Sequence, residues 1–188
     1  MTASSPMPDL SSADGKRLLQ LARQALEAYL KTGDHLEFIP QNDSFTAHCG
    51  CFVTLRSGDQ LRGCIGTFDC GKPLYENVIR MAIAAGTQDM RFKPLRPEEL
   101  AHIHIELSVL GELEKVEQLE AIEVGKHGIV VRCKNKNGTF LPEVAVEQGW
   151  QREEFLLRCA REKAGMSEKE CAEAEVYRYT VRKFSEDA

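Results

Sequence analysis

The sequence predicts an α+β domain in which helices pack against a mainly antiparallel sheet. Three observations lead to this fold class. Apolar residues recur every three or four positions after Ser11 and after Pro73, which is the period of an amphipathic helix. Other runs are rich in β-formers or alternate in polarity, as strands do, and short turns join two pairs of them into hairpins. At 188 residues with 43% hydrophobic residues, the chain suits one compact body.

The helices are expected where this period is bounded by start and stop signals. The first should run from Ser11 to Thr32, before Gly33. The second should begin at Pro73 and end at Gly86, and its small alanines predict close packing on a sheet. A third helix is expected over QREEFLLRCAREKAG, and the capping-box spacing in SEKE predicts a short fourth one.

The strands follow from alternation and from turn residues. A hairpin over residues 51–67 should turn at Ser57-Gly58-Asp59, and residues 103–110 alternate cleanly as one strand. The tight loop GKHG precedes a second hairpin, which is expected to turn at NKNG. Residues 176–184 form the last strand. We expect the first hairpin and the strands at 103–110 and 176–184 to share one sheet, covered by the first two helices.

Charge and composition narrow the classes of function. With 24 basic and 29 acidic residues and no long basic run, the chain is not expected to bind nucleic acid. It has no apolar run long enough to span a membrane and no secretory signal at its start, so we expect a cytoplasmic protein without a membrane partner. Residues 1–10 are expected to be disordered, residues 11–184 to fold, and residues 185–188 to fray.

Seven cysteines raise the question of a metal site. The number is odd and the spacing is unlike that of a small disulfide-rich domain, so the thiols should be reduced. Cys49, Cys51, Cys64 and Cys70 lie in one short region, but their C-x-C and C-x5-C spacing differs from the usual zinc knuckle. We therefore expect small buried thiols and no structural zinc, and a zinc site is the alternative.

Several motifs give the chain a family resemblance. The segment LRGCIGTF is followed in order by QDMRFKPLRPEEL, ELSVL, GKHGI, FLPEVA and YRYTVRKF. In these motifs the chain resembles the AMMECR family, and in particular its bacterial branch, called AmmeMemoRadiSam system protein A. The likeness runs from about Leu18 to Phe184. It implies a single domain over residues 11–184 with a larger and a smaller subdomain, and a functional cleft near LRGCIG. It also implies a Memo-like protein and a radical S-adenosylmethionine protein as partners, without implying a reaction.

Cys64 is the first candidate for chemistry, because a thiolate is a strong nucleophile. Arg62 would point to the same face of an ideal strand and supply a cation, while Gly63 and Gly66 would allow a ligand or loop to approach the backbone. The alternative is that Cys64 is a small packing residue between two glycines.

Other ionisable residues complete the candidate site. His127, in the GKHG loop, is the candidate general base, with a surface loop histidine as the alternative. Asp89 and Arg91 would either orient a polar ligand or lock their loop by an ion pair. Glu143 is the one ionisable group in the LPEVA segment, which we expect to form a wall of the cleft beside Trp150.

A polar strand face offers a second arrangement. His102, His104 and Glu106 would project together and could hold a metal, but such a face is also typical of the solvated side of a sheet, and we predict no metal there. Phosphate-loop, Rossmann, serine-hydrolase, zinc-protease and iron–sulfur motifs are missing, and no cofactor is indicated.

Two functions follow from these residues. The leading hypothesis is a cytoplasmic enzyme, or an enzyme-like component of a modification system, that binds a small molecule or a modified side chain around Cys64. The alternative is a non-catalytic binding or scaffold protein that docks a Memo-like or radical S-adenosylmethionine partner.

Overall fold

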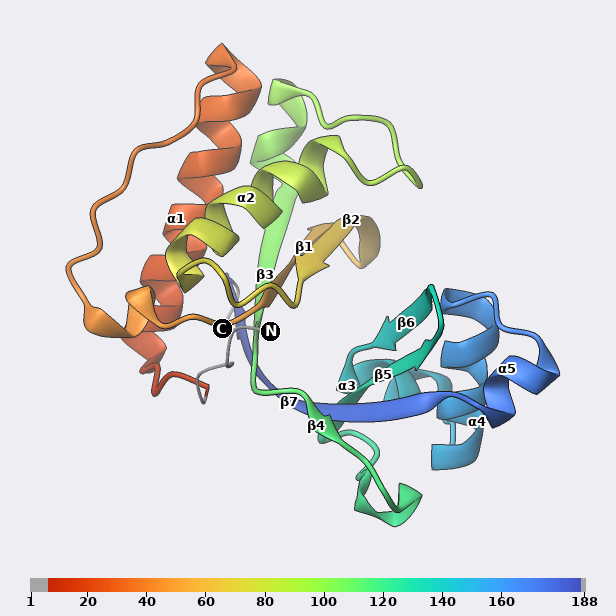
Figure 1. Ribbon diagram of the computed structural model, residues 1–188. Coiled ribbons are helices and arrows are strands. Elements are labelled where there is room, and N and C mark those ends of the chain that lie inside the picture. Colours follow the sequence, from red (N-terminus) through yellow and green to blue (C-terminus); the bar gives the residue numbers. More distant parts are fainter. Residues whose placement is uncertain (1–6, 187–188) are drawn as a thin grey trace. The chain divides into compact units, whose positions relative to one another are not determined.

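The computed structural model describes residues 7–186, and the chain divides into two compact units. Unit 1 comprises Met1–Gly111 and Arg182–Ala188, and unit 2 comprises Glu112–Val181. The predicted α+β class is confirmed (Figure 1). The strand order along the sheet is β2-β1-β3-β7-β5-β6, with β4 paired to β7, so the first hairpin and the two later strands share one sheet as expected.

Unit 1 is built from a hairpin, a third strand and two helices. Strand β1 lies between β2 and β3 and pairs with both in antiparallel register. The element bounds are α1 Ser12–Thr32, η1 Asp43–Thr46, β1 Cys51–Ser57, β2 Gln60–Thr67, α2 Leu74–Thr87, η2 Pro97–His102 and β3 Ile103–Leu110. Helix α1 starts at a capping box made by Ser11 and Asp14 and ends at Gly33, whose φ is 79°.

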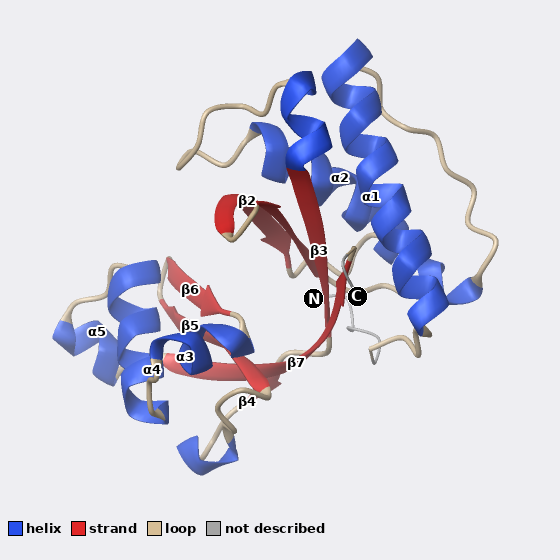
Figure 2. Cartoon of the chain, turned by 180° about the vertical axis from the view of Figure 1, so that it is seen from behind, coloured by secondary structure: helices blue, strands red, loops and turns tan. Residues whose placement is uncertain are grey.

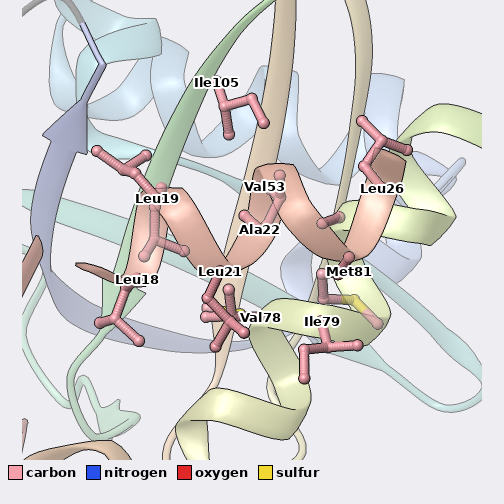
Figure 3. Close-up of a cluster of buried hydrophobic side chains, with 14 of the residues drawn as sticks. Leu18, Leu19, Leu21, Ala22, Leu26, Val53, Val78, Ile79, Met81 and Ile105 are labelled. Carbon is pink, nitrogen blue, oxygen red and sulfur yellow. The ribbon is translucent and has the colours of Figure 1, made fainter. Parts of the chain in front are cut away.

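One face of this three-stranded part carries the core of unit 1. Alternate residues of the strands, among them Val53 and Ile105, pack against apolar positions of α1 and α2 (Figure 3). Figure 3 shows Leu18, Leu21 and Ala22 of α1 projecting into this cluster. Residues such as Thr54 and Cys64 alternate with the core positions and therefore lie on the other face.

Unit 2 has its own core. Its element bounds are β4 Glu114–Lys115, η3 Leu119–Ala121, β5 His127–Cys133, β6 Lys136–Phe140, α3 Pro142–Gln148, α4 Arg152–Arg158, η4 Cys159–Lys163 and α5 Glu168–Ala172. Strand β7, Glu175–Ser185, begins in unit 2 and its residues from Arg182 onward belong to unit 1. Strand β5 pairs with β6 and with β7, both antiparallel, and Figure 2 shows these strands in red with blue helices beside them. Phe140, Phe155 and Ile129 belong to one buried cluster that helices and strands of this unit share.

The second hairpin turns earlier than expected. Its loop is Lys134-Asn135 and not NKNG, because Cys133 pairs with Lys136. Lys134 takes the left-handed conformation, with a φ of 54°. Gly138 lies within β6. A Cβ atom there would stand 2.9 Å from the backbone oxygen of Cys159, so this glycine lets the π-helical segment η4 pack against the strand.

The ends of the folded region also differ from expectation. Leu10 is fully buried, and Glu186 bonds to Arg23 and to the backbone of Ile105. The remaining parts of the segments expected to be disordered or frayed, residues 1–6 and 187–188, lie outside the described residues. No helix within residues 7–186 has the length and apolar character needed to cross a membrane.

Candidate functional site

Strand β2 carries Cys64 at the edge of the sheet, and glycines shape its surroundings. A Cβ atom on Gly63 would lie 2.2 Å from the carbonyl oxygen of Ala85 in α2, and one on Gly66 would meet the ring of Phe52 at 2.2 Å. Neither glycine has a positive φ. These two glycines therefore provide space for a neighbouring helix and ring, and no special dihedral angle requires them.

The sulfur of Cys64 accepts a hydrogen bond from a neighbouring strand. Thr54 on β1 is directly opposite Cys64, and its Oγ1 donates to Sγ at 3.3 Å. Because the backbone N–H and C=O of Cys64 bond to groups outside this hairpin, the two residues form a non-hydrogen-bonded pair, in which side chains lie closest. Thr54 is buried and Cys64 is half-buried.

Asp89 holds the backbone N–H of Cys64. It follows the end of α2, and its Oδ2 accepts from the Cys64 N–H at 2.8 Å. The side chain is 4% exposed, yet hydrogen bonds to the Arg91 guanidinium and to the backbone N–H groups of Cys64 and Arg91 lower the Asp89 pKa to about 2, against the opposing effect of burial. Asp89 is therefore a buried carboxylate that stays ionised.

Arg91 completes the clamp on Cys64. Its Nε donates to Asp89 Oδ1 at 2.9 Å and its Nη2 to Oδ2 at 2.7 Å, which makes a bidentate pair. Nη2 also donates to the carbonyl oxygen of Cys64 at 3.3 Å, and the guanidinium lies over the Phe92 ring. The Asp89–Arg91 pair thus satisfies both backbone groups of an edge-strand residue, as a neighbouring strand would.

Arg62 does not take the place that the sequence predicted beside the thiol. The β1–β2 register shifts between Leu55 and Arg56, which leaves Arg62 without a partner in a β-bulge. Its guanidinium forms a bidentate pair with Glu99 of η2, at 3.0 and 3.3 Å, and this pair lowers the Glu99 pKa. The cation that bonds to the Cys64 residue is Arg91 instead.

His127 belongs to unit 2 and lies at the first position of β5, not in a loop. Its Nδ1 accepts from the backbone N–H of Glu123 at 3.0 Å, so a neutral ring carries its proton on Nε2. Burial first, and then Arg178, lower the His127 pKa. A Cβ on the adjacent Gly128 would clash with Tyr179. This geometry favours a structural role for His127 over that of a general base.

Glu143 is also in unit 2, in the first turn of α3. The LPEVA segment, which was expected to form a wall of the cleft, starts this helix with Pro142 at its first position. Gly149 ends the helix with a φ of 67°. The structure describes the two units separately. It brings Cys64, Asp89 and Arg91 together in unit 1, and a cleft that they share with His127 and Glu143 stays a prediction.

The polar face of β3 is occupied by ion pairs. Glu106 bonds to Arg56 at 3.1 Å and to Lys183 at 3.0 Å, while the His104 ring contacts Ser185 Oγ at 2.8 Å. His102 ends η2 and does not lie in the strand. Among residues 7–186, no three potential ligands are grouped as a metal site would require. The expected absence of zinc stays a prediction.

The neighbouring thiols belong to the core. Cys49 and Cys51 are buried, and burial raises the Cys49 pKa to about 12 and also raises that of Cys51. The packing interpretation therefore fits these two residues. Cys64 differs from both because it is half-buried and its sulfur accepts a hydroxyl hydrogen bond.

Sequence reasoning missed three residues around Cys64. Thr54 bonds to the Cys64 sulfur, Glu99 bonds to Arg62, and Met90, which lies between Asp89 and Arg91, is 99% exposed. The position of Met90 in an irregular segment was a usable signal, because connecting segments run over the protein surface. Thr54 had no such signal, since its pairing depends on the bulge.

Comparison with known proteins agrees with this fold and these motifs. The AMMECR1 family profile matches residues 19–184, which is most of the chain. The chain belongs to the AMMECR1 family. A protein of Methanopyrus kandleri is 40% identical over 95% of this chain and 91% of its own length. Another AMMECR1 relative, from Methanothermobacter thermautotrophicus, is 40% identical over 95% of this chain and 97% of its own.

A solved structure supports the same assignment. The crystal structure of an uncharacterised protein from Pyrococcus horikoshii superposes with a TM-score of 0.89 at 35% identity, covering 95% of this chain and 94% of that one. The AMMECR1 relatives named here are archaeal. Membership of the bacterial branch stays a prediction.

Proposed function

We propose that this AMMECR1 protein is an enzyme, or an enzyme-like component of a modification system, whose nucleophile is Cys64. Its substrate is a small molecule or a modified side chain with an electrophilic carbon. The observation that carries the proposal is the hydrogen bond from Thr54 Oγ1 to the Cys64 sulfur, on a residue whose backbone is clamped on both sides. A hydrogen bond donated to sulfur stabilises the thiolate, which is the reactive form.

The reaction class is nucleophilic substitution at carbon. The Cys64 sulfur forms a bond to the substrate carbon, and the bond from that carbon to its leaving group breaks. The leaving group keeps the electron pair and takes up the proton that the thiol released. Asp89 and Arg91 act as positioning residues for the nucleophile, because their side chains hold the backbone N–H and C=O of Cys64. Roles for Glu143 and His127, which belong to unit 2, stay predictions.

Thiol labelling tests the proposal. We expect iodoacetamide at pH 7 to modify Cys64 about 10-fold faster than Cys171, which is also half-buried and serves as an internal reference. Peptide mass spectrometry would separate the seven cysteines. Thr54→Val should lower the Cys64 rate and leave the Cys171 rate unchanged. A Cys64 that reacts no faster than Cys171, or only on unfolding, would contradict the proposal.

A second candidate function rests on Met90. Met90 is 99% exposed in the loop that holds the Cys64 backbone, and the flexible methionine side chain adapts readily to the surface of a protein partner. In this alternative the loop docks a partner protein, and the Memo-like and radical S-adenosylmethionine proteins implied by the resemblance are the candidates. Partner binding that survives Cys64→Ser and is lost in Met90→Glu would favour this alternative over the enzyme.

A further inference from the structure

The guanidinium of Arg91 is held in one orientation beside Cys64. Its backbone N–H and Nε donate to Asp89 Oδ1, and Nη2 is shared between Asp89 Oδ2 and the Cys64 carbonyl. The Phe92 ring lies 5.4 Å from the guanidinium carbon. A long flexible side chain is therefore pre-organised, and a ligand would not have to pay the entropy of ordering it.

One end of this guanidinium remains available. Among the residues that the structure describes, no hydrogen bond joins Arg91 Nη1 to an acceptor. The Arg91 side chain is 50% exposed, whereas its partner Asp89 is 4% exposed. The ion pair is neutral in sum, but its negative end is buried and its positive end faces outward. An approaching molecule meets the cation first.

From this arrangement we infer that the substrate of the Cys64 site carries a carboxylate or phosphate, which Arg91 binds through Nη1. This inference rests on the proposed function, since it describes the substrate of the same thiol. An anionic group bound there would hold the electrophilic carbon of a small substrate beside the sulfur. Arg91 would then both position the Cys64 backbone and select the substrate by charge.

Two alkylating reagents of similar size test this inference. Iodoacetate and iodoacetamide react with thiols by the same chemistry, and the first carries a carboxylate. The quantity to measure is the rate of iodoacetate divided by that of iodoacetamide at Cys64, each relative to Cys171 in the same intact protein. We expect this ratio to fall about threefold to tenfold in Arg91→Gln, the effect of one partly screened charge at close range.

Matched variants separate a local effect from a general one. Lys93→Gln removes the same charge two residues along the same loop and should leave the ratio unchanged. Arg91→Lys keeps the charge and should retain part of the preference even if Arg91→Gln does not fold. If Cys64 reacts quickly with iodoacetamide but the ratio is the same in the wild type, Arg91→Gln and Arg91→Lys, the inference is overturned and the proposed function stands. If neither reagent modifies Cys64 in the folded protein, the proposed function falls and the inference falls with it.

Discussion

At the scale of single residues, Asp89 does the most to hold the candidate site. Its pKa of about 2 lies below the usual value of about 4 for an unfolded chain, so the ionised form stabilises the folded state. We predict that Asp89→Asn lowers the free energy of unfolding by about 1.5–3 kcal/mol at pH 7, because charge-assisted hydrogen bonds to Arg91 and Cys64 are weakened. The difference in the free energy of unfolding between wild type and Asp89→Asn should have its full size above about pH 4. It should shrink as the pH falls toward 2, because Asp89 then becomes protonated in the folded protein.

Urea unfolding of both proteins between pH 2 and pH 7 measures this difference. The control is Asp59→Asn, in the exposed turn between β1 and β2. It should change the free energy of unfolding by less than about 0.5 kcal/mol at any pH. A difference between wild type and Asp89→Asn that stays constant down to pH 2 would show that the carboxylate charge is not what stabilises the fold.

Gly63 is a second residue with a defined physical role. A methyl group there would stand 2.2 Å from the carbonyl oxygen of Ala85, and a helix backbone cannot move aside locally. We predict that Gly63→Ala costs about 1–3 kcal/mol in the free energy of unfolding. Gly66→Ala should cost less, because the atoms it meets belong to the Phe52 ring, which can rotate. Equal costs in denaturant unfolding would contradict this explanation.

At the scale of elements, Glu186, the residue after β7, joins α1 and β3 within unit 1. Arg23 of α1 donates twice to the Glu186 carboxylate, at 2.6 Å each, and the Ile105 N–H donates to it at 2.8 Å. Both side chains are mostly buried. We predict that Glu186→Gln lowers the free energy of unfolding by about 1.5–3 kcal/mol.

The control for this prediction is a more exposed ion pair with a similar distance between its nitrogen and oxygen atoms. Lys115 and Glu175 are 2.7 Å apart but about half exposed, so Glu175→Gln should lower the free energy of unfolding much less than Glu186→Gln does. Thermal unfolding monitored by circular dichroism would compare the two variants. Similar small shifts in Tm for both would mean that the contact of Glu186 adds little beyond a surface ion pair.

At the scale of the whole molecule, residues 7–186 contain two buried apolar clusters, one in each unit. Leu55 belongs to the cluster of unit 1 and Phe155 to that of unit 2, and both are fully buried. We predict that Phe155→Ala destabilises unit 2 by about 3–5 kcal/mol and accelerates amide hydrogen exchange within residues 112–181. Protection of the amides of α1 and β1 should change much less.

Leu55→Ala provides the reciprocal test. This substitution should lower the free energy of unfolding by about 2–5 kcal/mol, and amide hydrogen exchange should then become faster mainly in unit 1. If either substitution accelerated exchange equally in both units, the two clusters would unfold as one cooperative body and the prediction would be wrong.

The sequence by itself determined the elements and their faces. The apolar period after Ser11 and Pro73 and the alternation of residues 103–110 are properties of neighbouring residues, so each is visible before folding. The same holds for the choice of Cys64, because a thiol between two glycines in LRGCIG is a local feature. The fold class and the family could be predicted for this reason.

Only the tertiary structure decided which side chains meet. Counting back from the hairpin turn without a bulge would pair Thr54 with Gly63, and the one-residue shift at Leu55 pairs it with Cys64. The same shift leaves Arg62 in the bulge, where it bonds to Glu99. Arg91, which is 27 positions from Cys64 in the sequence, donates to the Cys64 carbonyl oxygen. A bulge and a contact between distant segments depend on how the elements pack, and that packing cannot be predicted from neighbouring residues in the sequence.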